Sequence, residues 1–181
     1  MVIVITGPIA SGKSTVAREL ARSLEAVGVP AAVIDLDLVH NELIATGSTA
    51  DESTWALARH RAAMAANAFS RDGVAVVIAE GSFNLPTDRA AFDQDLAANS
   101  SPVYVTLQVS FAEALRRAQG DPTRGRSRDP MFLGLYFAGR RDVLSATPAT
   151  DLAIDTEKTT AAEAVTTIAL LTRSSIPSRH N

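Results

Sequence analysis

Residues 7–15 have the composition of a polyphosphate-binding loop. They read Gly-Pro-Ile-Ala-Ser-Gly-Lys-Ser-Thr and match the pattern G-x-x-x-x-G-K-S/T in full. In such a loop the glycines let backbone N–H groups approach phosphate oxygens, the lysine reaches the β- and γ-phosphates, and a hydroxyl binds Mg²⁺. We therefore predict that ATP and Mg²⁺ bind here, with Ser14 as a metal ligand and nucleotide contacts from Gly7, Ala10, Ser11, Gly12, Lys13, Ser14 and Thr15.

Missing motifs narrow the class of P-loop protein. The guanine-recognition element Asn/Thr-Lys-x-Asp of GTPases is missing, because Lys158 is followed by two threonines. There is no LSGGQ-like segment, and a motor or transporter ATPase would normally need a chain longer than 181 residues. A small kinase is the class that remains.

Two carboxylates follow the second predicted strand. Asp35 and Asp37 stand at the carboxyl edge of a parallel sheet, where the ligands of such sheets bind. Their i, i+2 spacing points both side chains the same way if the strand continues. One could then hold Mg²⁺ through water while the other accepts a proton from a substrate hydroxyl. The alternative for Asp37 is the N-cap of a helix that starts near Leu38.

A third acid, Glu80, ends the third predicted strand at the same edge of the sheet. The next residue, Gly81, allows the close approach of a ligand. We expect Glu80 to support the metal or to contact the substrate, and Gly81 to lie beside the substrate. The alternative for Glu80 is a loop-exposed acid.

The stretch 120–130 is too rich in glycine and proline for a helix. It carries three arginines at alternate positions, Arg124, Arg126 and Arg128. Taken by itself, such a stretch is typical of a solvated loop.

The elements that must position these residues alternate between short β-branched runs and longer alanine-rich stretches of helical periodicity. Near-continuous apolar runs indicate strands covered on both faces, hence an α/β fold with a parallel sheet between helices. One domain is expected over residues 1–173, with a flexible tail at 174–181. Strands are predicted at 2–6, 31–34, 74–79, 103–109 and 152–154, and helices at 14–26, 51–71, 87–98, 111–119, 131–143 and 160–173.

The composition argues against several partners. With a net charge of −3, no overall positive field attracts nucleic acid or an anionic membrane. The absence of cysteine excludes disulfides, thiolate metal sites and cysteine nucleophiles. The longest apolar run, residues 74–79, is too short to span a membrane, and the N-terminus resembles a first strand more than a signal peptide. We expect a cytoplasmic monomer or homodimer without nucleic-acid or membrane partners.

Four segments together resemble a known group of enzymes: residues 7–15, Asp35-x-Asp37, Arg116-Arg117 and the final strand 151–156. In this order they are similar to the shikimate kinase, gluconate kinase and chloramphenicol phosphotransferase group of P-loop small-molecule kinases. The resemblance implies the nucleoside-monophosphate-kinase-like fold: a three-layer P-loop NTPase fold, a five-stranded parallel sheet of order 2-3-1-4-5 and an Arg-rich lid at about residues 120–130.

The resemblance also implies roles for individual residues. Asp37 matches the acceptor-binding general base, and Asp35 matches the magnesium-side acid. Arg116 or Arg117 would lie against adenine or its phosphates. Arg124 would be the lid arginine that covers the transferring phosphoryl group.

The acceptor pocket departs from the group's pattern. Glu80-Gly81-Ser82-Phe83 stands where shikimate kinases carry a glycine-rich turn, so shikimate is not the expected acceptor. His60 has no evident partner in the sequence. The resemblance places Arg140 or Arg141 near an acceptor-binding arginine, and the remaining pocket is expected from Phe83, Trp55, Arg59 and Arg61, although Trp55 alone suits a core as well.

The sequence thus predicts an ATP-dependent phosphotransferase acting on a hydroxyl of a small molecule. A nucleoside or nucleotide kinase is an alternative, because Arg59 and Arg61 suit an acceptor phosphate. A regulatory module that only binds ATP is another, although the pair Asp35 and Asp37 argues against it. A polynucleotide 5′-hydroxyl kinase is disfavoured by the acidic balance.

Overall fold

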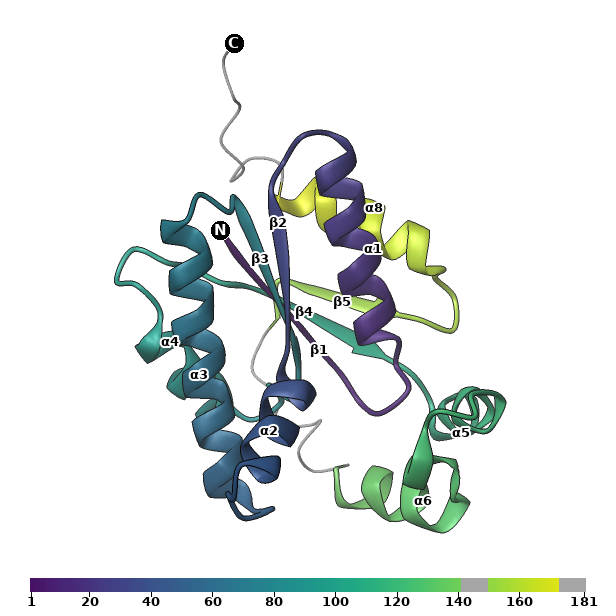
Figure 1. The fold of residues 1–181 in the computed structure, drawn as a ribbon. Helices are drawn as coiled ribbons and strands as arrows, with labels where there is room; N and C mark the ends of the chain where they lie inside the picture. The colour runs from purple at the N-terminus through teal and green to yellow at the C-terminus, as the bar shows by residue number, and fades with distance from the viewer. Residues whose placement is uncertain (141–149, 173–181) are drawn as a thin grey trace.

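Five parallel strands form one sheet, with the order β2-β3-β1-β4-β5 that the resemblance implied. The computed structural model describes residues 1–140 and 150–172 (Figure 1). The carboxyl ends of β1, β2 and β3 are neighbours, because β3 pairs with both of the others. The strands are β1 (Val2–Thr6), β2 (Ala31–Asp35), β3 (Val76–Gly81), β4 (Val103–Gln108) and β5 (Leu152–Asp155).

Helices cover both faces of the sheet, as predicted, but several boundaries differ. The helices are α1 (Lys13–Ala26), α2 (Leu36–Ala45), α3 (Glu52–Arg71), α4 (Pro86–Asp95), α5 (Phe111–Gly120), the short 3₁₀ helix η1 (Gly125–Arg128), α6 (Pro130–Gly139) and α8 (Ala161–Thr172). Arg141, the end of the predicted helix at 131–143 and the tail at 174–181 lie outside the described residues. No helix in the described part of the chain is both long and apolar enough to cross a membrane.

Alternate residues of each strand supply two cores, one on each face. Val2 and Val4 of β1 face the layer that contains α3 and α4, whereas Ile3 and Ile5 face α1 and α8. Figure 1 shows these two helix pairs on opposite sides of the sheet. Because both faces are covered, strands such as β1 are buried throughout, which explains their unbroken apolar sequences.

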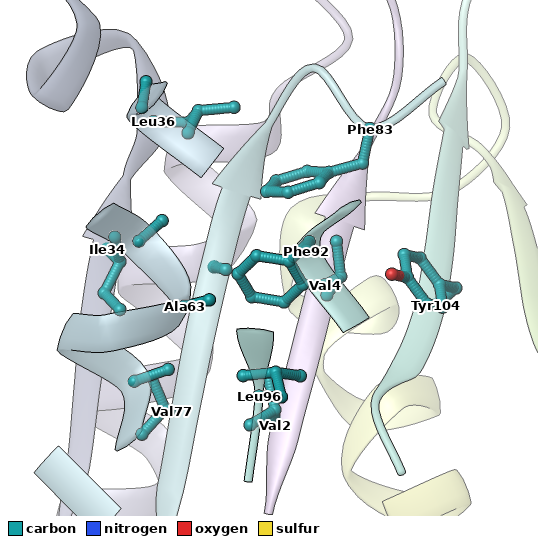
Figure 2. Packing of buried hydrophobic residues seen from close by; sticks show 14 of the residues in the cluster. Val2, Val4, Ile34, Leu36, Ala63, Val77, Phe83, Phe92, Leu96 and Tyr104 are labelled. Carbon is teal, nitrogen blue, oxygen red and sulfur yellow. The ribbon is translucent and has the colours of Figure 1, made fainter. Parts of the chain in front are cut away.

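Phe83 belongs to the first of these cores and not to the acceptor pocket, which corrects the expectation from the sequence. Its side chain is fully buried and its ring packs edge-on against Phe92, with 5.1 Å between the ring centroids. Figure 2 shows both rings in the middle of the layer, between Ile34 and Tyr104. The chain turns inward immediately after β3, so the aromatic residue at this position fills the core.

The arginine-rich segment is held by a smaller cluster at the carboxyl ends of the strands. Ala114 and Ala118 of α5 and Leu133 of α6 are buried against Ala10 of the phosphate-binding loop. The helix η1 lies between α5 and α6 in the chain and contacts both. The packing of two helices therefore places residues 124–128 beside the loop that follows β1.

Candidate active site

The loop after β1 has the backbone of a phosphate-binding loop. A side chain at Gly7 would collide with the carbonyl oxygen of Leu107, and φ is 148° there. Gly12 is the N-cap of α1 with a left-handed φ of 94°, which a side chain would strain. Both glycines of the sequence motif are thus required by the geometry.

Lys13 lies across this loop. Its Nζ atom donates hydrogen bonds to the carbonyl oxygens of Gly7 and Pro8, at 3.1 Å each. Burial lowers the pKa of Lys13, the carboxylates of Glu80 and Asp37 oppose this change, and nearby arginines add to it. The ammonium group of Lys13 therefore lies close to both acidic and basic side chains from other segments of the chain.

A cavity of about 1000 Å³ opens in front of this lysine. Its walls come from the phosphate-binding loop, α2, α3, the segment after β3, η1 and α6, which are far apart in sequence. The predicted site residues that line it are Gly7, Ala10, Gly12, Lys13, Ser14, Asp37, Arg59, Arg124 and Arg140.

The strand β2 does not continue to Asp37, contrary to the expectation from the spacing of the two aspartates. It ends at Asp35, and α2 begins at the next residue. Asp35 ends β2 and is the N-cap of α2, where its Oδ1 accepts hydrogen bonds from the backbone N–H groups of Asp37 (3.0 Å) and Leu38 (3.2 Å). The N-cap expected for Asp37 is thus supplied by Asp35. Asp37 lies in the first turn of α2 and lines the cavity.

Glu80 is a buried acid beside Lys13 and Ser14 of the loop that follows β1. It is 2% exposed, so the alternative of a loop-exposed acid is wrong. Its carboxylate accepts a hydrogen bond from Ser14 and lies close to Asp35, its register partner on β2. Burial raises the pKa of Glu80 to about 7; Asp35 adds to the rise, while the hydrogen bond from Ser14 and the charge of Lys13 oppose it.

Gly81 makes a different contact from the one expected. A Cβ atom at Gly81 would lie 2.5 Å from the Cβ of Leu36, and φ is 149°. The close approach that this glycine permits is therefore that of α2 to the end of β3. It lets the helix that carries Asp37 begin beside the strand that carries Glu80.

The three alternating arginines separate into two groups. Arg124 and Arg126 line the cavity, whereas Arg128 lies outside its walls. The Nε atom of Arg124 donates to Asp121 at 3.2 Å, and the guanidinium of Arg126 stacks 4.9 Å from the ring centre of Phe132.

A second cavity of about 320 Å³ lies behind the phosphate-binding loop and distinguishes Arg117 from Arg116. Arg117 lines it and donates hydrogen bonds to the carbonyl oxygens of Ala10 (3.4 Å) and Thr156 (2.6 Å). The side chain of Arg116 is 72% exposed, pairs with Glu113 and lines neither cavity. Ser11 and Thr15 of the motif also line this second cavity.

One part of the large cavity is lined by residues of α2, α3, α4 and the segment between β3 and α4. We call it the acceptor end, because the sequence predicts the acceptor pocket around Trp55 and Arg59. It contains residues that the sequence did not single out, namely His40, Asn41, Glu52, Asn84 and Asp88. Trp55 lines this end and stacks on His40, with 3.7 Å between ring centroids. Had a helix been assigned from Leu36, its periodicity would have placed His40 and Asn41 on the same face as Asp37. The other residues have no comparable signal in the sequence.

Arg59 and Arg61 of α3 lie in different environments. Arg59 is buried and lines the cavity, with its Nη2 atom 2.7 Å from Asp88 and 2.9 Å from Glu52. Arg61 is exposed and does not line the cavity, contrary to expectation. His60, left unassigned from the sequence, pairs on the surface with Asp95 at 2.9 Å.

A parallel sheet of this order, with a phosphate-binding loop after its first strand and arginines facing that loop, is the architecture of the small P-loop kinases. The sequence model of the adenylylsulphate kinase family matches residues 1–151. The chain belongs to this family. It is therefore an ATP-dependent kinase that transfers a phosphoryl group to a hydroxyl of a small molecule.

Solved structures with the same fold include several small-molecule kinases. The APS kinase CysC of Mycobacterium tuberculosis, in complex with AMPPNP and APS, is 21% identical, with a TM-score of 0.72 over 95% of this chain and 96% of that chain. A sugar kinase from Janibacter is 18% identical, with a TM-score of 0.69 over 95% and 94%. The shikimate kinase of Aquifex aeolicus is 21% identical, with a TM-score of 0.61 over 97% and 98%.

These likenesses show the fold, and together with the family they confirm the predicted membership of the P-loop small-molecule kinases. A comparison with curated proteins finds no match. The family also favours an enzyme over a module that only binds ATP.

Proposed function

We propose that the γ-phosphoryl group of Mg²⁺-ATP is transferred to an acceptor hydroxyl held beside Asp37. The observation that carries this proposal is the set of charged side chains that line one cavity around Lys13. Asp37, Arg124 and Arg140 line that cavity together with Lys13, and with Glu80 they act on the pKa of Lys13. An acid from the start of α2, an acid from the end of β3 and arginines from the η1 and α6 segments thus converge where phosphate would meet its acceptor.

The nucleotide is expected to bind across the two cavities. Its phosphates would accept hydrogen bonds from the backbone of residues 7–15 and pair with Lys13. Its base would enter the smaller cavity, whose walls include Thr159 and Thr160. Arg117 supports this proposal, because it joins the phosphate-binding loop to the end of β5.

The residues at the phosphate end fit a magnesium ion. Mg²⁺ prefers oxygen ligands and is commonly held by one or two carboxylates together with substrate phosphates. Ser14 offers a hydroxyl, Glu80 a carboxylate that already accepts from Ser14, and Asp35 a second carboxylate. When bound, the ion neutralises charge on the β- and γ-phosphates.

Transfer itself needs positioning and one proton acceptor. The acceptor oxygen bonds to the γ-phosphorus as the bond from that phosphorus to the β–γ bridging oxygen breaks, which releases ADP. The hydroxyl proton passes to the carboxylate of Asp37, which lines the cavity. Arg124 and Arg126 would stabilise the charge on the transferring group from the opposite wall.

Adenylylsulphate is the first acceptor to test, because the family model carries its name. ADP release should be measured with ATP and Mg²⁺ against adenylylsulphate, neutral sugars and polyols, sugar acids and nucleosides. Shikimate should be included in the same panel, and we expect no ADP release with it.

Lys13→Ala should abolish ADP release with any active acceptor, because it removes the cation of the loop. The matched control is Lys158→Ala, since that lysine is exposed and pairs only with Asp155 among the described residues. Near-normal turnover in Lys13→Ala would contradict the proposal, as would equal losses in both variants.

A further inference from the structure

Two buried nitrogen atoms at the acceptor end of the large cavity lack partners. His40 and Arg59 are 7% and 4% exposed, and both line the cavity. The Nε2 atom of His40 and the Nε atom of Arg59 have no hydrogen-bond partner within residues 1–140 and 150–172. An unpaired buried polar atom costs about 1–3 kcal/mol. The two atoms together indicate a ligand that brings more than one oxygen.

His40 is placed to contact the same ligand as Asp37. The two residues are three positions apart on α2, so they share a face of the helix, and both line the cavity. Their Cβ atoms are then about 5–6 Å apart. That spacing suits two hydroxyl groups of one carbon skeleton, one at Asp37 and a second at His40.

The chemistry of an imidazole nitrogen favours a hydroxyl as the partner. Nε2 of a neutral His40 is either a donor or an acceptor, according to the tautomer, and a hydroxyl can satisfy both forms. Trp55 stacks on the imidazole at an interplanar angle of 12° and so restricts its orientation. Trp55 itself lines the cavity and adds apolar surface for the C–H face of a ligand.

The charges at this end disfavour a strongly anionic acceptor. The Nη2 atom of Arg59 is already paired with Asp88 and Glu52. Five cations among the described residues line the whole cavity, but the proposed function assigns Lys13, Arg124 and Arg126 to the phosphates of ATP. The acceptor is then left with Arg59 and Arg140 against three carboxylates, those of Asp37, Glu52 and Asp88. A sulphate or phosphate would enter a region where carboxylates outnumber guanidinium groups, and a buried charge without a partner is costly.

We propose that the acceptor is a neutral polyhydroxylated molecule, a sugar or a polyol, and that His40 Nε2 hydrogen-bonds a hydroxyl other than the one phosphorylated. This inference rests on the proposed function and names its substrate class. His40 thus determines acceptor specificity, while the phosphoryl group moves from ATP to the hydroxyl beside Asp37.

The test uses the full chain with ATP and Mg²⁺ and a panel of aldoses, ketoses, hexitols and inositols, with adenylylsulphate and sugar acids as anionic comparisons. At least one neutral compound should give the highest kcat/KM. His40→Phe keeps an aromatic ring against Trp55 but removes Nε2, so its KM for that compound should rise about tenfold or more while kcat changes little. His60→Phe is the matched control, because His60 pairs with Asp95 on the surface and should leave KM unchanged.

Binding of Mg²⁺-AMPPNP, measured in wild type, Lys13→Ala and His40→Phe, separates the possible failures. Unchanged nucleotide affinity in His40→Phe shows that the variant is folded. Loss of the acceptor preference, with adenylylsulphate or a sugar acid favoured over every neutral compound, overturns the inference but leaves the proposed function standing. An unchanged KM in His40→Phe has the same meaning. The inference is also overturned, and the proposed function kept, if no neutral compound is turned over although nucleotide binding depends on Lys13. Nucleotide binding that does not depend on Lys13 overturns the proposed function itself.

Discussion

Asp35 and Glu80 are register partners on adjacent parallel strands, and the charge of Asp35 helps to raise the pKa of Glu80. The two acids are otherwise held differently. Asp35 uses one oxygen to cap α2, whereas Glu80 is buried and bonded to Ser14. Their separate contributions are therefore open to measurement.

Glu80 should make the nucleotide-free protein less stable as the pH rises. Its pKa is raised from 4.5 to about 7, so the folded state favours the protonated form. The stability associated with this group is complete below about pH 4.5 and is lost as the pH rises through about 7. The loss can reach about 3 kcal/mol of unfolding free energy.

Urea unfolding of wild type and Glu80→Gln at pH values between 5 and 8 checks this expectation. The glutamine variant cannot ionise, so the difference in unfolding free energy between the two proteins should grow in its favour with pH. A difference that stays constant across this range would contradict the raised pKa.

Asp37→Asn and Asp35→Asn should fail in different ways. The first removes the proposed base, so turnover should fall about 10²- to 10⁴-fold while ATP affinity changes little. The second keeps a good N-cap residue but loses a charge at the phosphate end, so the Mg²⁺ concentration needed for half-maximal activity should rise. Turnover is measured against Mg²⁺ concentration with an active acceptor.

Asp35→Ala isolates the capping role of Asp35. It should lower the free energy of unfolding by about 1 kcal/mol relative to Asp35→Asn, because alanine cannot accept from the N–H groups of Asp37 and Leu38. If Asp37→Asn retains full turnover, the base lies elsewhere, and Glu80 becomes the candidate.

The arginines of the segment 120–130 should not be equivalent. Arg124→Ala should lower kcat about 100-fold or more, since this arginine lines the cavity opposite the acids. Arg128→Ala should leave kcat unchanged, because Arg128 lies outside the cavity walls. Steady-state kinetics of both variants measures the two effects. Equal losses of kcat would contradict a specific role for Arg124.

The same segment should become protected when nucleotide binds. The resemblance to the small-molecule kinases predicts that this segment closes over the phosphates as a lid, so hydrogen exchange of residues 123–128 should slow in the presence of AMPPNP and Mg²⁺. Unchanged exchange would favour a solvated loop, the alternative that its composition suggests.

Arg117 and Arg116 provide a matched pair on one helix. Arg117→Ala removes donors from the carbonyl oxygens of Ala10 and Thr156, so it should weaken nucleotide binding and lower the unfolding free energy by about 1–3 kcal/mol. Arg116→Ala should change neither quantity, because Arg116 contacts only Glu113 among the described residues. Calorimetric titration with AMPPNP and urea unfolding measure the two effects.

The sequence alone was sufficient for the features that depend on contiguous residues. The phosphate-binding loop at 7–15 could be recognised because its function rests on local backbone shape, and the unbroken apolar strands revealed a sheet covered on both sides. The strand order followed from the resemblance to a family and was confirmed by the pairing.

The acceptor end was decided by tertiary structure. Arg116 and Arg117 are adjacent in sequence, but side chains one position apart on a helix point in different directions. The way α5 packs therefore determines that Arg117 reaches the phosphate-binding loop while Arg116 stays exposed. Phe83 entered the core because the chain turns inward after β3. Arg59 pairs with Asp88 only because α3 and α4 pack on the same face of the sheet. The ion pair neutralises a cation that the sequence assigned to the acceptor, and no local pattern in the sequence predicts it.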